Sequence, residues 1–527
     1  MNAPSVVEKQ KDIFFSRQAI AGVPWMVVSK GTLFFVYFAI SVLLVRLLGD
    51  VQYGVYTICI NIAETAGVLC GLGLISALFR FVPELVVQKN LAGLKRLLWK
   101  SLAFQAMTVL LAMIVFVSIK PLFDRWFSID FHHYLLLIGF VIMAGLLKDN
   151  VSAVETSLFR IKNVSIMSLI RGLGLVVMIA VGLTLVPSVT MALSIQIAAG
   201  LVYVVGAVLM FRHIYSFDWR SPPYGIGKRR TMKFSGAIMS STILRMMTMK
   251  YTEVFFLGLV VAPEIVGAYD LGYSLPPMVI FFIPDALHML FTSGFAEAYS
   301  RDKNCLGRLI KAYYKMQIAF TVPLAIFGFF FAAAAVRLIY GGQMAAAGGI
   351  ASAFCLIHLL STVSTPLSMA LKAKEKVMAS MPIMIFQIVV NLFLDWLLII
   401  HFKMGTTGAM IALTSALVLS MPVRIIIIRR ILGGIYFPAA YLLRMGISLF
   451  LLAGSFSLVS NHWKLLELFE TQWINIVTLF ALGGLYMLCY LIAIRFLRLI
   501  REEDIADFRA LDIKQLNKVF DLLSPRR

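Results

Sequence analysis

Long apolar runs, each about twenty residues and repeated along the chain, constrain this fold more than any other feature. A helix needs about 20 mostly apolar residues to cross the hydrocarbon core of a bilayer. Only helices and closed barrels satisfy their own backbone there, and barrel strands alternate apolar with polar residues. Runs that stay continuously apolar therefore predict an all-α membrane protein.

We expect about fourteen membrane-spanning helices, with boundaries that are soft by several residues. They lie near residues 20–46, 54–79, 101–121, 133–157, 164–187, 191–211, 236–261, 267–294, 317–340, 346–370, 380–401, 406–428, 437–460 and 473–495. Composition agrees, because 61% of the 527 residues are apolar and only 14% are charged. Too little polar sequence remains for a soluble catalytic domain, so we expect a polytopic membrane protein and not an enzyme.

Lys and Arg residues collect in alternate loops. The chain carries 47 Lys and Arg against 26 Asp and Glu, a formal net charge of +21. Cations such as Lys95 and Lys374 follow even-numbered spans, whereas the connection 187–190 has no charge. By the positive-inside rule, even-numbered spans end in the cytoplasm and both termini are cytoplasmic. No basic stretch forms a domain of its own, so we expect no nucleic-acid partner.

An internal repeat links the two halves of the chain. Phe81–Gly93 reads FVPELVVQKNLAG, and 214 residues later Phe295–Gly307 reads FAEAYSRDKNCLG. Gly54-Val-Tyr56 likewise faces Gly267-Ala-Tyr269 at an offset of 213. An even number of helices per half gives a parallel repeat about an axis along the membrane normal. We therefore expect two six-helix repeats plus two extra C-terminal helices, an arrangement typical of alternating-access transporters; a channel or a scaffold is the alternative.

The expected organisation has six parts. They are a cytoplasmic N-terminal segment (1–19), an N-terminal six-helix bundle (20–211), a cytoplasmic linker (212–235), a C-terminal six-helix bundle (236–428), transmembrane helices 13 and 14 (437–495) and a cytoplasmic amphipathic tail (496–527).

Several short motifs resemble the polysaccharide and oligosaccharide flippase family, whose superfamily also holds multidrug extruders and lipid II flippases. They are Arg46-Leu-Leu-Gly49, Tyr53-Gly-Val-Tyr56, Gly73-Leu-Ile-Ser-Ala77, Arg80-Phe-Val-Pro-Glu84, Arg337-Leu-Ile-Tyr-Gly341, Asn391-Leu-Phe-Leu-Asp395 and Gly405-Thr-Thr-Gly-Ala409. Each motif alone is weak, but their order and spacing are similar to those of the family from residue 20 to about 430.

The resemblance implies a multi-pass protein of the bacterial inner membrane that translocates an undecaprenyl-diphosphate-linked oligosaccharide to the outer leaflet. Such a glycan is a repeat unit of O-antigen, capsule or exopolysaccharide. The expected partners are this polyprenyl-diphosphate-linked glycan and membrane lipids. The tail is expected to lie on the membrane surface, with contact to a polysaccharide polymerase or a glycosyltransferase as the alternative. A cation-coupled multidrug or toxin extruder of the same superfamily is the alternative function.

Charged residues inside the spans are the candidate site, because such residues usually face a wet cavity or a partner. The candidate substrate-binding residues are Lys30, Asn61, Glu64, Arg171, Arg245, Lys250, Asp270 and Asp285. The cations would bind a diphosphate, while amide and carboxylate groups would bind sugar hydroxyls. Glu64, Asp270 and Asp285 are the carboxylates that could carry a proton; whether a proton or sodium is coupled stays open.

Other interpretations of these charges remain open. Lys250 and Glu253 are three residues apart and could neutralise each other, while Lys148 and Asp149 could extend toward the membrane surface. The seven histidines and five cysteines are scattered, so we expect no metal site, no cofactor and no catalytic centre.

Overall fold

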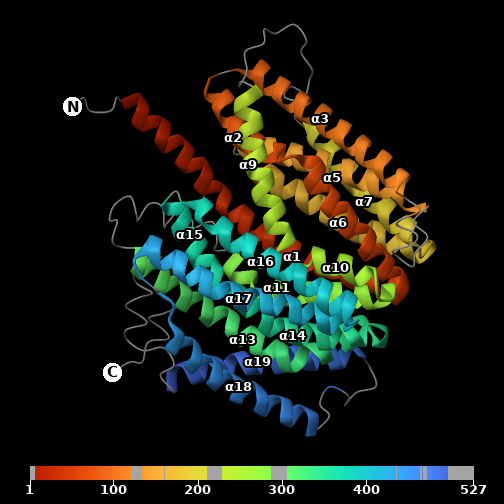
Figure 1. The fold of residues 1–527 in the computed structure, drawn as a ribbon, viewed down its shortest axis with the longest axis vertical. Helices are drawn as coiled ribbons and strands as arrows, with labels where there is room; N and C mark the ends of the chain where they lie inside the picture. Colours follow the sequence, from red (N-terminus) through yellow and green to blue (C-terminus); the bar gives the residue numbers. More distant parts are fainter. Residues whose placement is uncertain are drawn as a thin grey trace. The chain divides into compact units, whose positions relative to one another are not determined.

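The structure is a computed structural model. It describes residues 6–88, 90–119, 121, 133–158, 161–210, 228–285, 306–374, 376–434, 436–462, 466 and 472–496; the side chains of residues 6–30 are not among those described. Within these ranges the regular elements are all helices, and no strand occurs (Figure 1). The prediction of an all-helical membrane protein is confirmed.

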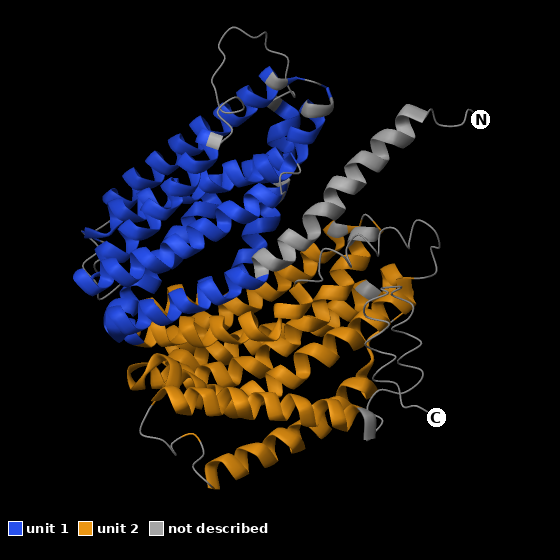
Figure 2. Ribbon diagram, turned by 180° about the vertical axis from the view of Figure 1, so that it is seen from behind, with its two compact units in different colours: residues 1–251, 262–264 blue, residues 252–261, 265–527 orange. Residues whose placement is uncertain are grey.

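The chain forms two compact units, which Figure 2 shows in different colours. Unit 1 comprises residues 1–251 and 262–264, and unit 2 comprises 252–261 and 265–527. Unit 1 contains α1 (Val6–Gly71), α2 (Leu74–Val87), α3 (Leu91–Ser118), α5 (Leu135–Ser157), α6 (Ile161–Leu185), α7 (Val189–Met210) and α9 (Lys228–Met247). The bundle limits expected at residues 211 and 236 stay a prediction.

Unit 2 contains most of α10 and α11 and all the later elements. They are α10 (Tyr251–Gly258), α11 (Pro263–Ile280), α13 (Leu306–Tyr340), η2 (Gly342–Met344), α14 (Ala345–Ser361), η3 (Thr362–Ser364), α15 (Thr365–Ala373), η4 (Val377–Ser380), α16 (Met381–Asp395), η5 (Trp396–His401), α17 (Gly405–Leu432), α18 (Ala439–His462) and α19 (Gln472–Phe496). In the core, α13 packs against α18 and α19, where Tyr486 and Tyr490 donate hydrogen bonds to the carbonyls of Pro323 and Ala319.

Eleven of the described helices are long and apolar enough to cross a membrane. The first of them, Gly31–Gly71, is counted once although Gly49 leaves helical geometry at φ 76° and divides α1 into two. The expected spans at 236–261 and 267–294 fall on α9, α10 and α11, which are not among the eleven because they are too short or not apolar enough. A multi-pass architecture is established, and the number fourteen stays a prediction.

A break between α1 and α2 shapes the interior of unit 1. Leu72 and Gly73 have φ of 49° and 69°, so the helix ends at Gly71 and restarts at Leu74. The carbonyl of Gly71 accepts a hydrogen bond from Gln105 Nε2 at 3.2 Å, and α3 also supplies a hydroxyl donor to the carbonyl one residue earlier. These side chains replace the backbone donors that the break removes, as buried carbonyls require. The expected span at 54–79 therefore contains a break at residues 72–73.

The second copy of the repeated motif, Phe295–Gly307, lies almost wholly outside the described residues, as do Lys30's side chain and the tail 497–527. The repeat and the placing of the tail therefore stay predictions.

Candidate functional site

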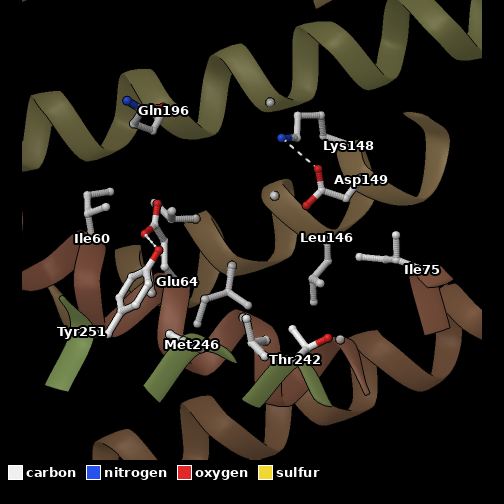
Figure 3. Close-up of a pocket in the computed structure, with 18 of the residues that line it drawn as sticks. Ile60, Glu64, Ile75, Leu146, Lys148, Asp149, Gln196, Thr242, Met246 and Tyr251 are labelled. Carbon is white, nitrogen blue, oxygen red and sulfur yellow. Dashed lines mark hydrogen bonds and ion pairs between the residues drawn. The ribbon is translucent and has the colours of Figure 1, made fainter. Parts of the chain in front are cut away.

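A cavity of about 720 Å³ lies inside unit 1. Its walls come from the second half of α1, from α2, α5, α6, α7 and α9, and from Tyr251 (Figure 3). On α1 the lining positions are Tyr56, Ile60, Glu64 and Gly71, which recur at helical spacing along one face. The break at Gly73 lets this wall turn, so Ile75 and Ser76 of α2 also line the cavity.

Two side-chain hydrogen bonds lie along the walls of the cavity. Tyr251 donates its hydroxyl to Glu64 Oε2 at 2.8 Å, and Gln196 Nε2 donates to the Tyr56 hydroxyl at 3.1 Å. Figure 3 shows the Glu64–Tyr251 pair and the Lys148–Asp149 pair as separate interactions, with Gln196 on another helix. Carboxylate, amide and phenol groups are the side chains that bind hydroxyl-rich ligands.

The other polar groups of the cavity are mainly cationic. Lys148 Nζ and Asp149 Oδ1 form an ion pair at 2.8 Å. Arg171 on α6 is half-buried, and its Nε has no hydrogen-bond partner among the described residues. Arg245 on α9 is exposed. Neither arginine forms an ion pair with a carboxylate in the part of the chain that the structure describes, so both are placed to receive an anion.

The structure brings three of the eight candidate residues to this cavity: Glu64, Arg171 and Arg245. Asn61 is buried beside the cavity wall but does not line it, and Lys250 follows α9 in a turn outside the lining. The others are Lys30, whose side chain lies outside the described residues, and Asp270 and Asp285, which belong to unit 2.

Sequence reasoning missed several lining residues. Lys148 and Asp149 line the cavity as a pair, where we had considered that they extend toward the membrane surface. Tyr251 and Gln196 were also missed, because each meets its partner from more than a hundred residues away. On the second half of α1, Glu64 lines the cavity, while Thr57 and Asn61 are buried in the helix packing.

Helix α9 forms one wall of the cavity, and its N-terminal end is attached to α2 by an ion-pair cluster and an aromatic contact. We call this attachment the fastening. Arg230 binds both carboxylate oxygens of Glu84 on α2, at 2.7 and 3.1 Å, and Arg80 binds the same carboxylate at 3.2 Å. Phe234 packs against Phe81 edge-on with ring centroids 5.5 Å apart. The hydrogen bond from Arg230 holds the pKa of the Glu84 carboxyl below its ordinary value. Glu84 therefore joins two helices and is not a ligand group.

Unit 2 contains a second polar group, buried between α10 and α16. Glu253 and Asp395 are both 0% exposed, and Asn391 between them is 1% exposed. Asn391 Nδ2 donates to Glu253 Oε1 at 3.1 Å and to Asp395 Oδ2 at 3.0 Å. One amide group thus holds two carboxylates together. No group of three or more His, Cys, Asp or Glu side chains that could hold a metal ion occurs among the described residues.

Comparison with known proteins decides the family. The family model of polysaccharide biosynthesis proteins matches residues 43–347, which is more than half of the chain. The chain belongs to this polysaccharide biosynthesis family. The resemblance to polysaccharide flippases that the motifs indicated is confirmed. Among curated proteins no sequence match is found.

Solved structures show which fold the family member adopts. The chain is similar to the lipid II flippase MurJ in an inward closed conformation, with a TM-score of 0.64 and 15% identity over 92% of this chain and 100% of that chain. It is also similar to an outward-facing multidrug resistance MATE transporter, with a TM-score of 0.54 and 15% identity over 79% and 95% of the two chains.

A third similar structure is a MOP-superfamily transporter from Pyrococcus furiosus, with a TM-score of 0.53 and 14% identity over 79% and 96% of the two chains. All three relatives are transporters or flippases, in agreement with the expectation of a transporter rather than an enzyme. The family member therefore has the fold of MOP-superfamily transporters.

Proposed function

We propose that this protein translocates a polyprenyl-diphosphate-linked oligosaccharide from the cytoplasmic to the outer leaflet of the bacterial inner membrane by alternating access. The observation that carries the proposal is the unit 1 cavity, where Arg171 and Arg245 face an interior that also holds Glu64, Tyr251 and Gln196. The arginines bind the diphosphate, and the other groups bind sugar hydroxyls.

The physical problem explains why such a cavity is needed. Each polar group taken into hydrocarbon without a hydrogen bond costs about 2–7 kcal/mol, so a bare sugar meets a large barrier. A cavity that offers hydrogen bonds removes most of this barrier while the polyprenyl chain stays in the lipid. The membrane potential also favours outward movement of an anionic diphosphate, by about 2.3 kcal/mol per charge per 100 mV.

The coupling ion belongs to the same proposal. Two buried carboxylates that share one amide donor are stable only when their charge is neutralised, because burial of unpaired charge is expensive. A proton or a monovalent cation at Glu253 and Asp395 supplies this neutralisation. We therefore place coupling at Glu253 and Asp395, in preference to Glu64, Asp270 and Asp285. A polymerase or glycosyltransferase that contacts the tail stays a proposal without a structural observation behind it.

The test uses cells that lack the protein. We expect one complete glycan unit to accumulate on its polyprenyl carrier, and mass spectrometry of the lipid-linked pool detects it. Re-expressed Arg171→Ala or Arg245→Ala should leave this pool at least about tenfold above wild type, because a lost charge-assisted hydrogen bond is worth about 1.5–3 kcal/mol. Arg337→Ala, on α13 of unit 2, is the matched control and should restore export. An unchanged lipid-linked pool, together with altered sensitivity to drugs, would instead support the extruder.

A further inference from the structure

The cavity of unit 1 contains two carboxylates whose surroundings differ. Asp149 is paired with Lys148 at 2.8 Å, so this pair carries no net charge toward a ligand. Glu64 is exposed, and its described partner is the neutral hydroxyl of Tyr251. No Lys, Arg or His lies within ion-pair distance of Glu64 among the described residues. Glu64 therefore presents a net negative charge to the cavity.

Other neutral donors and acceptors line the same cavity as Glu64. Gln196 uses one N–H on the Tyr56 hydroxyl and keeps its amide oxygen for a ligand. Glu64 and Tyr251 form what we call the Glu64 subsite, while Gln196 and Tyr56 line the same cavity. A sugar hydroxyl that donates to the carboxylate makes a charge-assisted hydrogen bond, which is about twice as strong as a neutral one.

The same carboxylate penalises an acidic sugar. A uronate at the Glu64 subsite would bring two like charges together, and no described cation of that subsite can separate them. Protein sites reject a wrong ligand in this way, by a like charge or an unpaired charge set against it. Arg171 and Arg245 do not remove the conflict, because a bound diphosphate neutralises them.

We propose that Glu64 makes the transporter selective for glycans whose sugars nearest the diphosphate are neutral or carry an amine, and that it excludes uronate-bearing glycans. This inference rests on the proposed function, because it requires the diphosphate to bind at Arg171 and Arg245. It assigns the substrate class by the charge of the glycan.

The experiment compares three matched probes on the purified full-length protein in nanodiscs, by calorimetric titration. Each probe is a farnesyl-diphosphate-linked disaccharide that begins with N-acetylglucosamine. The second sugar is glucose, glucuronate or glucosamine. On the wild-type protein we expect the glucuronate probe to bind about tenfold more weakly than the glucose probe, and the glucosamine probe to bind at least as tightly.

Three variants assign the selectivity to one charge. Glu64→Gln keeps the hydrogen bonds but removes the charge, so the tenfold difference should disappear. Glu64→Asp keeps the charge and should keep the difference. Glu264→Gln, the control, removes a carboxylate that does not line the cavity and should leave the ratio of the two affinities unchanged. Because the three probes are compared on the wild type first, the inference is tested even if a variant does not fold.

The outcomes separate this inference from the proposed function. If Arg171→Ala abolishes binding but wild type and Glu64→Gln do not distinguish the glucose and glucuronate probes, charge selection by Glu64 is wrong and the function stands. If no probe binds the wild type, or if Arg171→Ala binds as the wild type does, both fail. Loss of the tenfold difference in Glu64→Gln alone supports both.

Discussion

The buried group of Glu253, Asn391 and Asp395 shows how the free-energy cost of burying charge implies that the charge is neutralised. Sequence alone named Glu253 beside Lys250 and Asp395 in a family motif, but their meeting depends on the packing of α10 against α16, where Glu253 and Asn391 are 138 residues apart in sequence. A single Nδ2 amide serves both carboxylates. Asn391, which lies between the two carboxylates, is polar but uncharged. An added proton or cation must therefore neutralise the charge of Glu253 and Asp395.

Neutral substitutions at this group should uncouple transport from the ion gradient. We expect Glu253→Gln or Asp395→Asn to abolish the dependence of export on pH or sodium, because the amide removes the charge that the cation neutralises. Binding of the glucose probe in unit 1 should change less than about twofold. The readout is export in vesicles with imposed proton or sodium gradients. Glu264→Gln, at the start of α11, is the control, and a coupling that survives Asp395→Asn would contradict the assignment.

The candidate site was predictable in part at this scale. Charges within apolar runs identified Glu64, Arg171 and Arg245, because the expense of placing them in hydrocarbon implies a wet environment. The same reasoning did not find Tyr251 or Gln196. The free-energy cost of placing a tyrosine or glutamine in hydrocarbon is too small to identify such a residue as a site candidate. Their role depends on which helix lies opposite, and no periodicity encodes that.

Among the elements, α9 stands out because it is both a wall of the cavity and a helix fastened to its neighbours. Met239, Thr242 and Arg245 line the cavity, while Arg230 and Phe234 attach the other end of the helix to α2. Gly73 completes the junction, because a Cβ there would lie 2.3 Å from the Ser235 carbonyl oxygen. A change at the fastening should therefore alter access to the cavity some four turns away.

Charge reversal tests the fastening. Arg230→Glu should raise the rate at which a maleimide labels Thr242→Cys severalfold, because like charges now separate α9 from α2. The double variant with Glu84→Arg should return the rate toward wild type. Equal rates in all three proteins would show that the ion pair does not hold the wall.

The pH dependence follows from the lowered pKa of Glu84. A group whose pKa is lower in the folded state stabilises the contact above its unfolded value, near 4.5, and loses this only as pH falls through the folded pKa. The ratio of the Thr242→Cys labelling rate with Arg230→Glu to the rate with Arg230 intact should therefore stay constant between pH 6 and 8.

Helix positions were largely predictable, and breaks within helices were not. Apolar windows located most helices to within a few residues of their observed ends, because hydropathy and length fix a span. The interruption at Leu72 and Gly73 has no hydropathy signal, since both neighbours are apolar. It depends on Gln105 and Thr108 of α3 to satisfy the freed carbonyls.

For the whole molecule, the property to test is the membrane topology, that is, the side of the membrane on which each loop lies. Eleven described helices meet the criteria for a span, and the charge distribution adds an alternation of loops. Short cytoplasmic loops collect cations, so the loop that contains Lys95 and the one that contains Lys374 should lie on the same side. Ser188, between α6 and α7, and Gln472, at the start of α19, should lie on the other.

Single cysteines at these four positions test the arrangement. In spheroplasts with an intact inner membrane, an impermeant maleimide should label Ser188→Cys and Gln472→Cys. It should label Lys95→Cys and Lys374→Cys only after the membrane is permeabilised. Mass shift on a gel reads the result. Labelling of Gln472→Cys and Lys374→Cys from the same side would mean that the count of spans between them is wrong.

Helix α10 begins at Tyr251 and carries Glu253 two residues later. Tyr251 donates a hydrogen bond to Glu64, and Glu253 belongs to the buried group at which we place ion coupling. Coupling between the two positions would act through α10, in which they lie two residues apart. Thermodynamic reciprocity then requires that, if the ion changes the affinity for the glycan, the glycan changes the affinity for the ion by the same factor.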